Sequence, residues 1–230
     1  MEAFSEELLS QLESKISFVI PVFGGIPVPT SVVVTWGIMI VLVLCSIIFV
    51  RNLETIPKRT QNVIEIAVEW LNQFFEDILG KEGKRYIPYL STVALYIACA
   101  NLIGIFGFTP PTKDLDVTAG LAIMSIILIE YAGIKAKGTK KWIRSFAEPM
   151  ALIAPINVLE VFIRPLSLCM RLFGNVLGAF VVMELIKMVI PIALPVPFSV
   201  YFDIFDGLIQ AYVFVFLTSL FVQEAIEVEE

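Results

Sequence analysis

Long apolar runs alternate with short polar segments along this chain, and their lengths match membrane-crossing helices. Residues 32–50 and 87–108 contain no charged side chain, and residues 117–134 contain only one. Two longer apolar runs follow, at residues 152–190 and 198–223. About 20 apolar residues suffice to cross a hydrocarbon core of about 30 Å. The pattern therefore predicts an all-α integral membrane protein with five membrane-crossing helices.

Residues 61–79 have a different pattern, in which apolar positions such as Val63 and Trp70 recur at helical spacing. Acidic residues, among them Glu65 and Glu69, occupy the other faces. So many charges exclude a membrane span. We expect an amphipathic helix on the cytoplasmic side that either lies on the membrane surface or docks a partner. The acidic polar face favours the partner, because helices drawn to anionic lipid are rich in lysine.

Basic residues indicate which loops are cytoplasmic. Arg51, Lys58 and Arg59 follow the first span, and five basic residues lie between positions 135 and 144, after the third span. By the positive-inside rule both regions are cytoplasmic, so the N-terminus is outside and the C-terminus is inside. Residues 1–31 then form an outer segment. This segment lacks the basic region of a cleavable signal, and we expect the first span to insert uncleaved.

The fourth run is too long for a perpendicular helix. About 39 residues at 1.5 Å each extend about 58 Å, roughly twice the hydrocarbon thickness. The helix must therefore tilt, bend or extend outside the membrane, and Pro165 offers a point for a kink. With residues 198–223 it forms a long tilted hairpin. We expect all these elements to belong to a single membrane domain over residues 1–230.

The composition agrees with a membrane protein and excludes several classes of site. Of the 230 residues, 58% are hydrophobic and only 17% are charged, whereas about 25% are charged in soluble domains. The net charge of −6 argues against binding to nucleic acid. Cys45, Cys99 and Cys169 stand alone in apolar segments, and histidine is absent. We therefore expect no metal site, no disulfide and no cofactor.

A fixed positive charge, Arg171, lies within the fourth apolar run. A guanidinium cannot neutralise itself, because its pKa exceeds about 12. At the centre of a span it costs at least about 2.5 kcal/mol, so such residues are usually functional. At about 100° per residue, Glu160, Arg164 and Asn175 fall within about 40° of Arg171. Gly174 lies beside this polar stripe, as does Gly178, and both would let another helix approach closely.

The final run repeats the pattern. Its stripe, within about 40° on the same count, contains Ser199, Asp203, Asp206 and Gln210. One interpretation is that the two stripes only tie the hairpin together by buried hydrogen bonds. We favour an ion path, because packing alone does not need so many ionisable groups, each with a desolvation cost.

The ionisable groups divide between the two ends of the hairpin, with Arg171 between them. Near the cytoplasmic end are Glu160 and Arg164, and near the outer end are Glu184, Asp203 and Asp206. Lys187 is three residues from Glu184 and can pair with it. This arrangement predicts two half-paths for an ion that do not meet, separated by a fixed cation.

The stretch RPLSLCMRLFGN at residues 164–175, followed by QAYVF at residues 210–214, resembles subunit a of the F-type ATP synthases. The resemblance extends over nearly the whole chain and includes PKRTQNVIE, NLIGIFGFTPPTKDLDVT, IKAKG and LIQAYVFVFLTSLFV.

The resemblance implies that Arg171 is the arginine that faces the ion-binding carboxylate of the rotating c-ring. Asn175 matches the polar residue one turn on, and Gln210 matches a glutamine that faces the arginine. Implied partners are the c-ring subunits, the peripheral-stalk b subunits and the lipid of a bacterial plasma membrane. The implied role is to couple proton or sodium flow to rotation without chemistry on ATP, and the chain has no Walker-type phosphate loop.

The sequence departs from the family pattern at one position. Family members often carry a titratable residue nine positions after the arginine and another seven before the glutamine. Here these positions are Phe180 and Asp203. Our hypothesis is that Asp203, together with Asp206 and Glu184, lines the outer half-path.

Three other classes remain as alternatives. A secondary ion-coupled transporter with a charged core would show internal repeats and broken helices, and no repeat is evident here. A stand-alone channel does not suit five unequal spans. A purely structural scaffold would tolerate the loss of Arg171.

Overall fold

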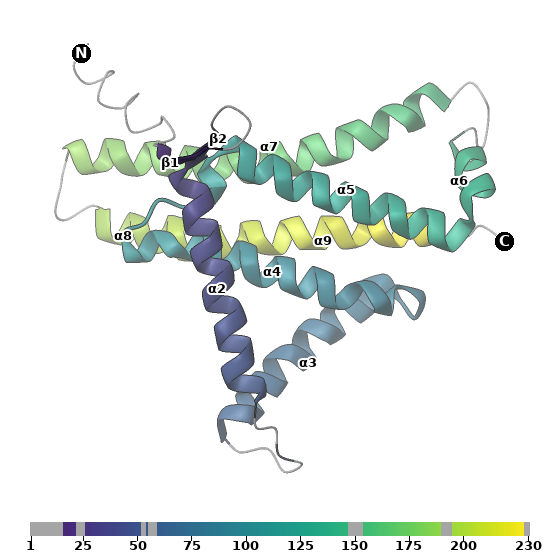
Figure 1. The fold of residues 1–230 in the computed structure, drawn as a ribbon, viewed down its shortest axis with the longest axis horizontal. Helices are drawn as coiled ribbons and strands as arrows, with labels where there is room; N and C mark the ends of the chain where they lie inside the picture. Colours follow the sequence, from purple (N-terminus) through teal and green to yellow (C-terminus); the bar gives the residue numbers. More distant parts are fainter. Residues whose placement is uncertain are drawn as a thin grey trace. The chain divides into compact units, whose positions relative to one another are not determined.

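The computed structural model describes residues 16–21, 26–51, 54, 59–146, 154–189 and 195–227. The other parts of the predicted segments, including residues 1–15, 152–153 and the end of the acidic tail, lie outside the described residues. Figure 1 shows the succession of helices along the chain, with one strand pair at its start. The long helices are α2 (Thr30–Val50), α3 (Arg59–Leu79), α4 (Ile87–Leu102), α5 (Leu115–Lys137), α7 (Ala154–Val189) and α9 (Gly207–Ile226).

Five helical segments are long and apolar enough to cross a membrane. They confirm the predicted class, an all-α membrane protein with five spans. The amphipathic helix predicted at residues 61–79 is α3, which begins two residues earlier. Of the residues of α2, only Ser31 and Ile38 are buried by the described chain. The rest of this helix presents apolar side chains outward, as expected of a surface in contact with lipid.

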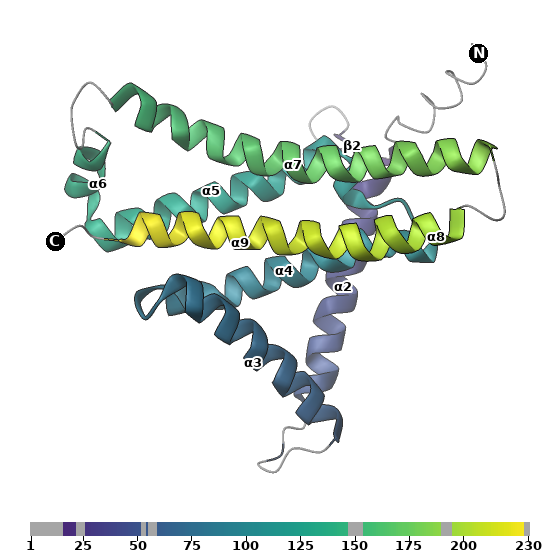
Figure 2. The same cartoon turned by 180° about the vertical axis from the view of Figure 1, so that it is seen from behind.

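The helix α7 continues through Pro165 over 36 residues, about 54 Å at 1.5 Å per residue. Figure 2 shows it as one uninterrupted coil. Proline removes one backbone donor from a helix but does not have to end it. The helix is thus longer than a membrane is thick, as the sequence predicts.

The described residues fall into two compact units that each take pieces of several helices. Unit 1 draws on Met1–Val43, Tyr96–Thr118 and Met170–Ala211. Unit 2 draws on Leu44–Leu95, Ala119–Cys169 and Tyr212–Glu230. The expectation of a single membrane domain stays a prediction.

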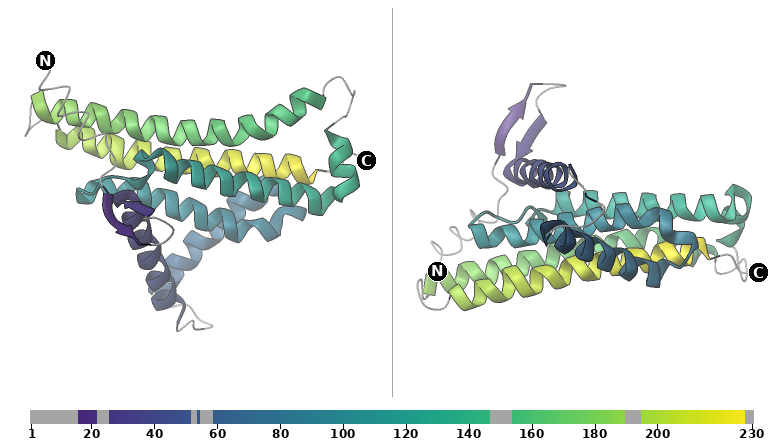
Figure 3. Two further views of the ribbon diagram at one scale, coloured as in Figure 1. Left: turned by 45° about the horizontal axis from the view of Figure 1, so that its top comes forward. Right: turned by 90° about the horizontal axis from the view of Figure 1, so that it is seen from below.

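Unit 1 begins with a β-hairpin that the sequence analysis did not anticipate. Strand β1 (Ile16–Ile20) pairs antiparallel with β2 (Ile26–Pro29), and the register changes between Ile16 and Phe18. Figure 3 shows the two strands beside the first turns of α2. The Phe18 ring lies 6.5 Å from the Trp36 ring, centroid to centroid, and Ser17 hydrogen-bonds Thr30. These contacts attach the hairpin to α2.

The connection between α4 and α5, which the sequence predicts to lie outside, is folded into unit 1. After α4 come two 3₁₀ turns, η2 (Ile103–Phe106) and η3 (Pro111–Lys113). Gly107 separates them with a φ of +81°, a left-handed conformation that glycine adopts without a Cβ penalty. All three residues of η3 are buried. The turn η3 is therefore part of the core of unit 1.

The backbone hydrogen bonds of the final predicted span do not keep one helical register. A short helix α8 (Pro195–Ser199) leads into a π-helix η5 (Val200–Asp206), and α9 follows. In a π-helix the backbone bonds span five residues instead of four. The predicted stripe over residues 199–210 assumed a constant 100° per residue, so its geometry is wrong across η5.

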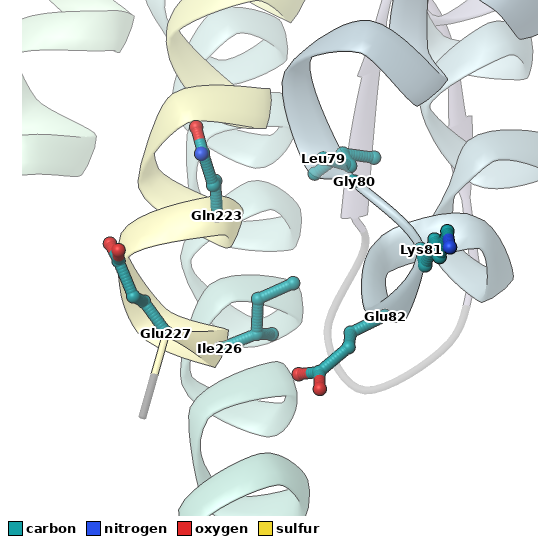
Figure 4. A pocket seen from close by; sticks show the side chains of 7 residues that line it. All are labelled: Leu79, Gly80, Lys81, Glu82, Gln223, Ile226 and Glu227. Carbon is teal, nitrogen blue, oxygen red and sulfur yellow. The ribbon is translucent and has the colours of Figure 1, made fainter. Parts of the chain in front are cut away.

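Unit 2 contains all of α3, most of α5 and α9, and the short helix α6 (Thr139–Ser145). Its fully buried side chains include Phe75, Leu90, Ile129 and Val222. Trp142 of α6 donates from Nε1 to Glu130 Oε2 at 3.1 Å, which fixes α6 to α5. A small open pocket lies where α3 ends near the end of α9 (Figure 4), lined by Leu79, Gly80, Lys81, Glu82, Gln223, Ile226 and Glu227.

Candidate functional site

Arg171 lies on an exposed face of α7 in unit 1. Its neighbours Leu172 and Val176 point into the core and are 1% and 8% exposed. No hydrogen bond or ion pair joins the guanidinium to any described residue. The helix therefore anchors its apolar face in the chain and presents an uncompensated cation on the opposite face.

The residues beside Arg171 on this face of α7 have small or polar side chains. Gly174, Asn175 and Gly178 are all exposed. A Cβ built on either glycine would meet nothing within 4 Å. The described chain thus leaves an open strip along α7, as the sequence predicts for a surface that receives another helix.

Gln210 is 7% exposed at the start of α9, also in unit 1. No hydrogen bond joins its side-chain amide to the described residues. Among the described residues, the fully buried side-chain polar atoms without a partner belong to Ser31, Tyr89 and Ser91, so the amide atoms of Gln210 remain accessible. This residue therefore provides unused donor and acceptor capacity.

Asp203 is half-buried in η5 and accepts a short hydrogen bond at Oδ2 from Ser199 Oγ. Its other oxygen lies against Gly104 of η2. A Cβ at Gly104 would lie 2.6 Å from Asp203 Oδ1, too close for any real contact. The glycine therefore makes the space that the carboxylate occupies.

The two other predicted outer acids differ from Asp203. Asp206 is half-buried at the end of η5, and no hydrogen bond or ion pair joins it to the described residues. Glu184 accepts from Lys187 Nζ at 2.8 Å, which confirms the predicted i, i+3 pair. The side chain of Glu184 is 13% exposed and that of Lys187 is 50% exposed. The charge of Glu184 is thus compensated within α7.

Two buried polar residues that the sequence analysis missed connect the segments of unit 1. Asn101 of α4 donates from Nδ2 to the Gly207 carbonyl oxygen at 2.9 Å. Its Oδ1 accepts from Thr112 Oγ1 at 2.8 Å. Asn101 is 3% exposed and Thr112 is fully buried. An amide inside an apolar helix is the one sequence signal that could have identified Asn101.

Lys113 is a third residue that the sequence analysis did not select. It is only 8% exposed, and its Nζ lies 4.3 Å from the centroid of the Phe180 ring. A desolvated cation over an aromatic face gains about 2 kcal/mol. The position where the family pattern suggests a titratable group therefore carries, in this chain, a ring covered by a cation.

In unit 2, the two predicted inner residues are joined to a partner on α9. Arg164 donates to Glu160 Oε2 at 3.0 Å and to Glu224 Oε1 at 2.6 Å. Its guanidinium carbon also lies 5.1 Å from the centroid of the Phe221 ring. Arg164 thus differs from Arg171, because two carboxylates compensate its charge.

Asn157, in the first turn of α7, donates from Nδ2 to the Phe146 carbonyl oxygen at 3.0 Å. It links the beginning of α7 to the end of α6 within unit 2. Among the described residues no group of three Asp, Glu, Cys or His side chains could hold a metal ion.

Comparison with known proteins gives a consistent result. A family model described as ATP synthase A chain matches residues 32–223. The chain is 39% identical over 200 residues to the ATP synthase subunit a of Moorella thermoacetica, which covers 86% of this chain and 91% of that protein. It is 36% identical over 202 residues to the ATP synthase subunit a 1 of Pelobacter propionicus, covering 86% and 87%.

A third relative, from Propionigenium modestum, is named ATP synthase subunit a, sodium ion specific. It is 31% identical over 218 residues, which cover 88% of this chain and 75% of that protein.

Proposed function

The chain belongs to the ATP synthase A chain family, whose members are ion-translocating membrane subunits of ATP synthase, and on this premise we propose that Arg171 separates two half-paths for the ion. The observation that carries the proposal is the exposed, uncompensated guanidinium on α7. A cation left without partners among the described residues of its own chain is expensive in a membrane. Its partner is then a carboxylate supplied by another subunit.

The mechanism follows from electrostatics. A ring carboxylate that approaches Arg171 is favoured in its charged form, so it releases its ion there. An ion that tried to pass directly from one half-path to the other would meet the same fixed charge in a low dielectric. Rotation of the ring is then the remaining route. The driving free energy is about 2.3 kcal/mol per charge per 100 mV, plus the concentration gradient.

We assign the outer half-path to Asp203, Asp206 and Glu184 of unit 1. The half-buried position of Asp203 and its bond to Ser199 support a site that holds an ion before transfer. Asn175 and Gln210 provide polar groups for the same region. Glu160 and Arg164 of unit 2 belong to the inner half-path, where Arg164 pairs with both Glu160 and Glu224.

The partners in this proposal are the c-ring subunits on the Arg171 face and the peripheral-stalk b subunits. The chain itself performs no chemistry on ATP. The N-terminus lies outside a bacterial plasma membrane and the C-terminus lies in the cytoplasm. The driving ion is a proton or a sodium ion, and the relative named sodium ion specific motivates a test of both.

Cross-linking tests the placement of the ring. A cysteine at Asn175, on the exposed strip of α7, should form a disulfide with cysteines in the ring helices of the assembled complex. A cysteine at Val176 provides a control, because this side chain points into the core and is 8% exposed. Equal cross-linking at both positions, or at neither, would contradict the assignment of this face.

A further inference from the structure

Asn101 joins three segments of unit 1 that are far apart in the sequence. It lies in the last turn of α4, and both its side-chain bonds leave that helix. One bond reaches Thr112 in the buried turn η3, and the other reaches the Gly207 carbonyl at the beginning of α9. A buried amide with both ends satisfied by other segments fixes how these segments fit together.

The bond to Gly207 is made at the residue where the π-helix η5 gives way to α9. At such a junction the register of backbone hydrogen bonds changes from five residues to four. The Gly207 amide itself bonds to the carbonyls of both Ile204 and Phe202. A Cβ at Gly207 would lie 3.0 Å from Asn101 Cβ. The close approach and the hydrogen bond together hold the junction from outside the helix.

The same end of α4 also receives the Asp203 carboxylate. Gly104 follows Asn101 by three residues and lies against Asp203 Oδ1. The turn η2 that packs against η5 contains no titratable side chain. The ionisable residues on the segment itself are Tyr201, Asp203 and Asp206. Among the described residues no cation forms an ion pair with Asp203, so its position depends on the hydrogen bond from Ser199 and on backbone geometry.

We propose that Asn101 is a positioning residue for ion transfer at Asp203. By holding the Gly207 carbonyl it keeps the π-helical register of η5 and directs the carboxylate against Gly104. Without this bond the segment relaxes toward ordinary α-helical pairing. One residue's difference in register turns Asp203 by about 100° relative to α9. The proposal rests on the role of Asp203 proposed above.

The test uses the assembled complex in inverted membrane vesicles and measures ATP-driven ion pumping per assembled complex. Asn101→Leu removes both side-chain bonds at similar size, and Thr112→Val removes only the bond to η3. We expect Asn101→Leu to lower pumping by about tenfold. We expect it also to move the pH, or the sodium concentration, of half-maximal pumping by about one log unit. Thr112→Val should leave this midpoint in place.

Gly207→Ala provides a second measurement that is independent of the amide, because its Cβ presses on Asn101. It should shift the pH or sodium concentration of half-maximal pumping in the same way. If Asn101→Leu does not assemble, the midpoint of Gly207→Ala tests the proposal in its place. An unchanged midpoint in the assembled variants would overturn the proposal, since a purely structural role lowers the amount of complex and not its ion dependence.

Asp203→Asn is measured in parallel. If Asp203→Asn pumps normally, the outer path itself is wrong. If it fails while Asn101→Leu keeps its midpoint, only the role of Asn101 is wrong.

Discussion

Arg164 and Glu224 form an ion pair of 2.6 Å between residues sixty positions apart, one on α7 and one on α9. Glu160, one turn before Arg164, accepts from the same guanidinium nitrogen. The pair joins the two helices within unit 2 and leaves Arg164 with two carboxylates. The two arginines of α7 are therefore in opposite electrostatic situations, although they share one predicted stripe.

The first prediction concerns this pair. Glu224 is 59% exposed, so the pair is screened, and exposed pairs contribute about 0.2–1 kcal/mol. In a double-mutant cycle of Arg164→Gln and Glu224→Gln, we expect a coupling of about 0.5 kcal/mol. The measurement is the temperature at which the subunit leaves the purified complex. ATP-driven pumping should stay within about threefold of normal in Glu224→Gln, because a coupling of this size changes a rate by about that factor. Loss of pumping would show that Glu224 takes part in transport.

The second prediction separates Arg171 from Arg164. Arg171→Lys should abolish ion-coupled ATP synthesis in an assembled complex. A lysine keeps a charge but is a compact, strongly hydrated point charge without the planar fork of arginine. Arg164→Lys is the control on the same helix and should retain synthesis, because its charge can still pair with Glu160 and Glu224. Normal synthesis by Arg171→Lys in reconstituted membranes would contradict the proposal that Arg171 separates the two half-paths.

The third prediction concerns Asp203 and the glycine beside it. Asp203→Asn keeps the shape but removes the charge, and we expect loss of ion-coupled synthesis. Gly104→Ala leaves the acid in place but puts a methyl group where Asp203 Oδ1 lies. The carboxylate must then rotate away, so we expect partial loss of pumping. Gly120→Ala is a matched control, because nothing lies within 4 Å of its Cβ position. Full activity of Asp203→Asn would contradict the assignment.

The spans could be predicted because hydropathy reports directly on burial in lipid. The number of spans follows from runs of uncharged residues, and the length of α7 follows from the distance between the breaks that flank it. Arg171 could be selected as a candidate site residue for the same reason, since a fixed charge in such a run requires an explanation. These features depend on local composition alone.

Other features depend on partners that are distant in the sequence. The hairpin β1–β2 includes the prolines of IPVP, which weaken any strand prediction. The π-helix η5 adds a register change that a count at 100° per residue does not detect. A loop lysine is expected in water, so the burial of Lys113 over Phe180 was missed. The pairing of Arg164 with Glu224 crosses sixty residues, and no periodicity in one helix reveals it.

The fourth prediction concerns Lys113, the buried cation in the connection between α4 and α5. Lys113→Met keeps the length of the side chain but removes its charge, and with it the contact to Phe180. We expect the subunit to be less stable by about 1–2 kcal/mol, the range for a desolvated cation–π contact. Phe180→Leu should have a similar effect, and the double variant should not add the two. Lys141→Met is the control, since that side chain is exposed and no hydrogen bond or ion pair joins it to the described residues. Additive losses in thermal release of the subunit would show that the two residues act separately.

The last prediction concerns the open strip beside Arg171. Gly174 and Gly178 have no neighbour within 4 Å of a built Cβ, and neither has a positive φ. A larger residue therefore fits this chain, and replacing a helical glycine favours the helix by up to about 1 kcal/mol. If a second helix packs on the strip, the same residue obstructs that contact. We expect Gly174→Leu and Gly178→Leu to give normal amounts of inserted subunit but to lose cross-linking to the ring and ATP synthesis. Gly120→Leu on α5 is equally open and should have no such effect. Normal synthesis in both strip variants would mean that the partner of Arg171 approaches from another side of α7.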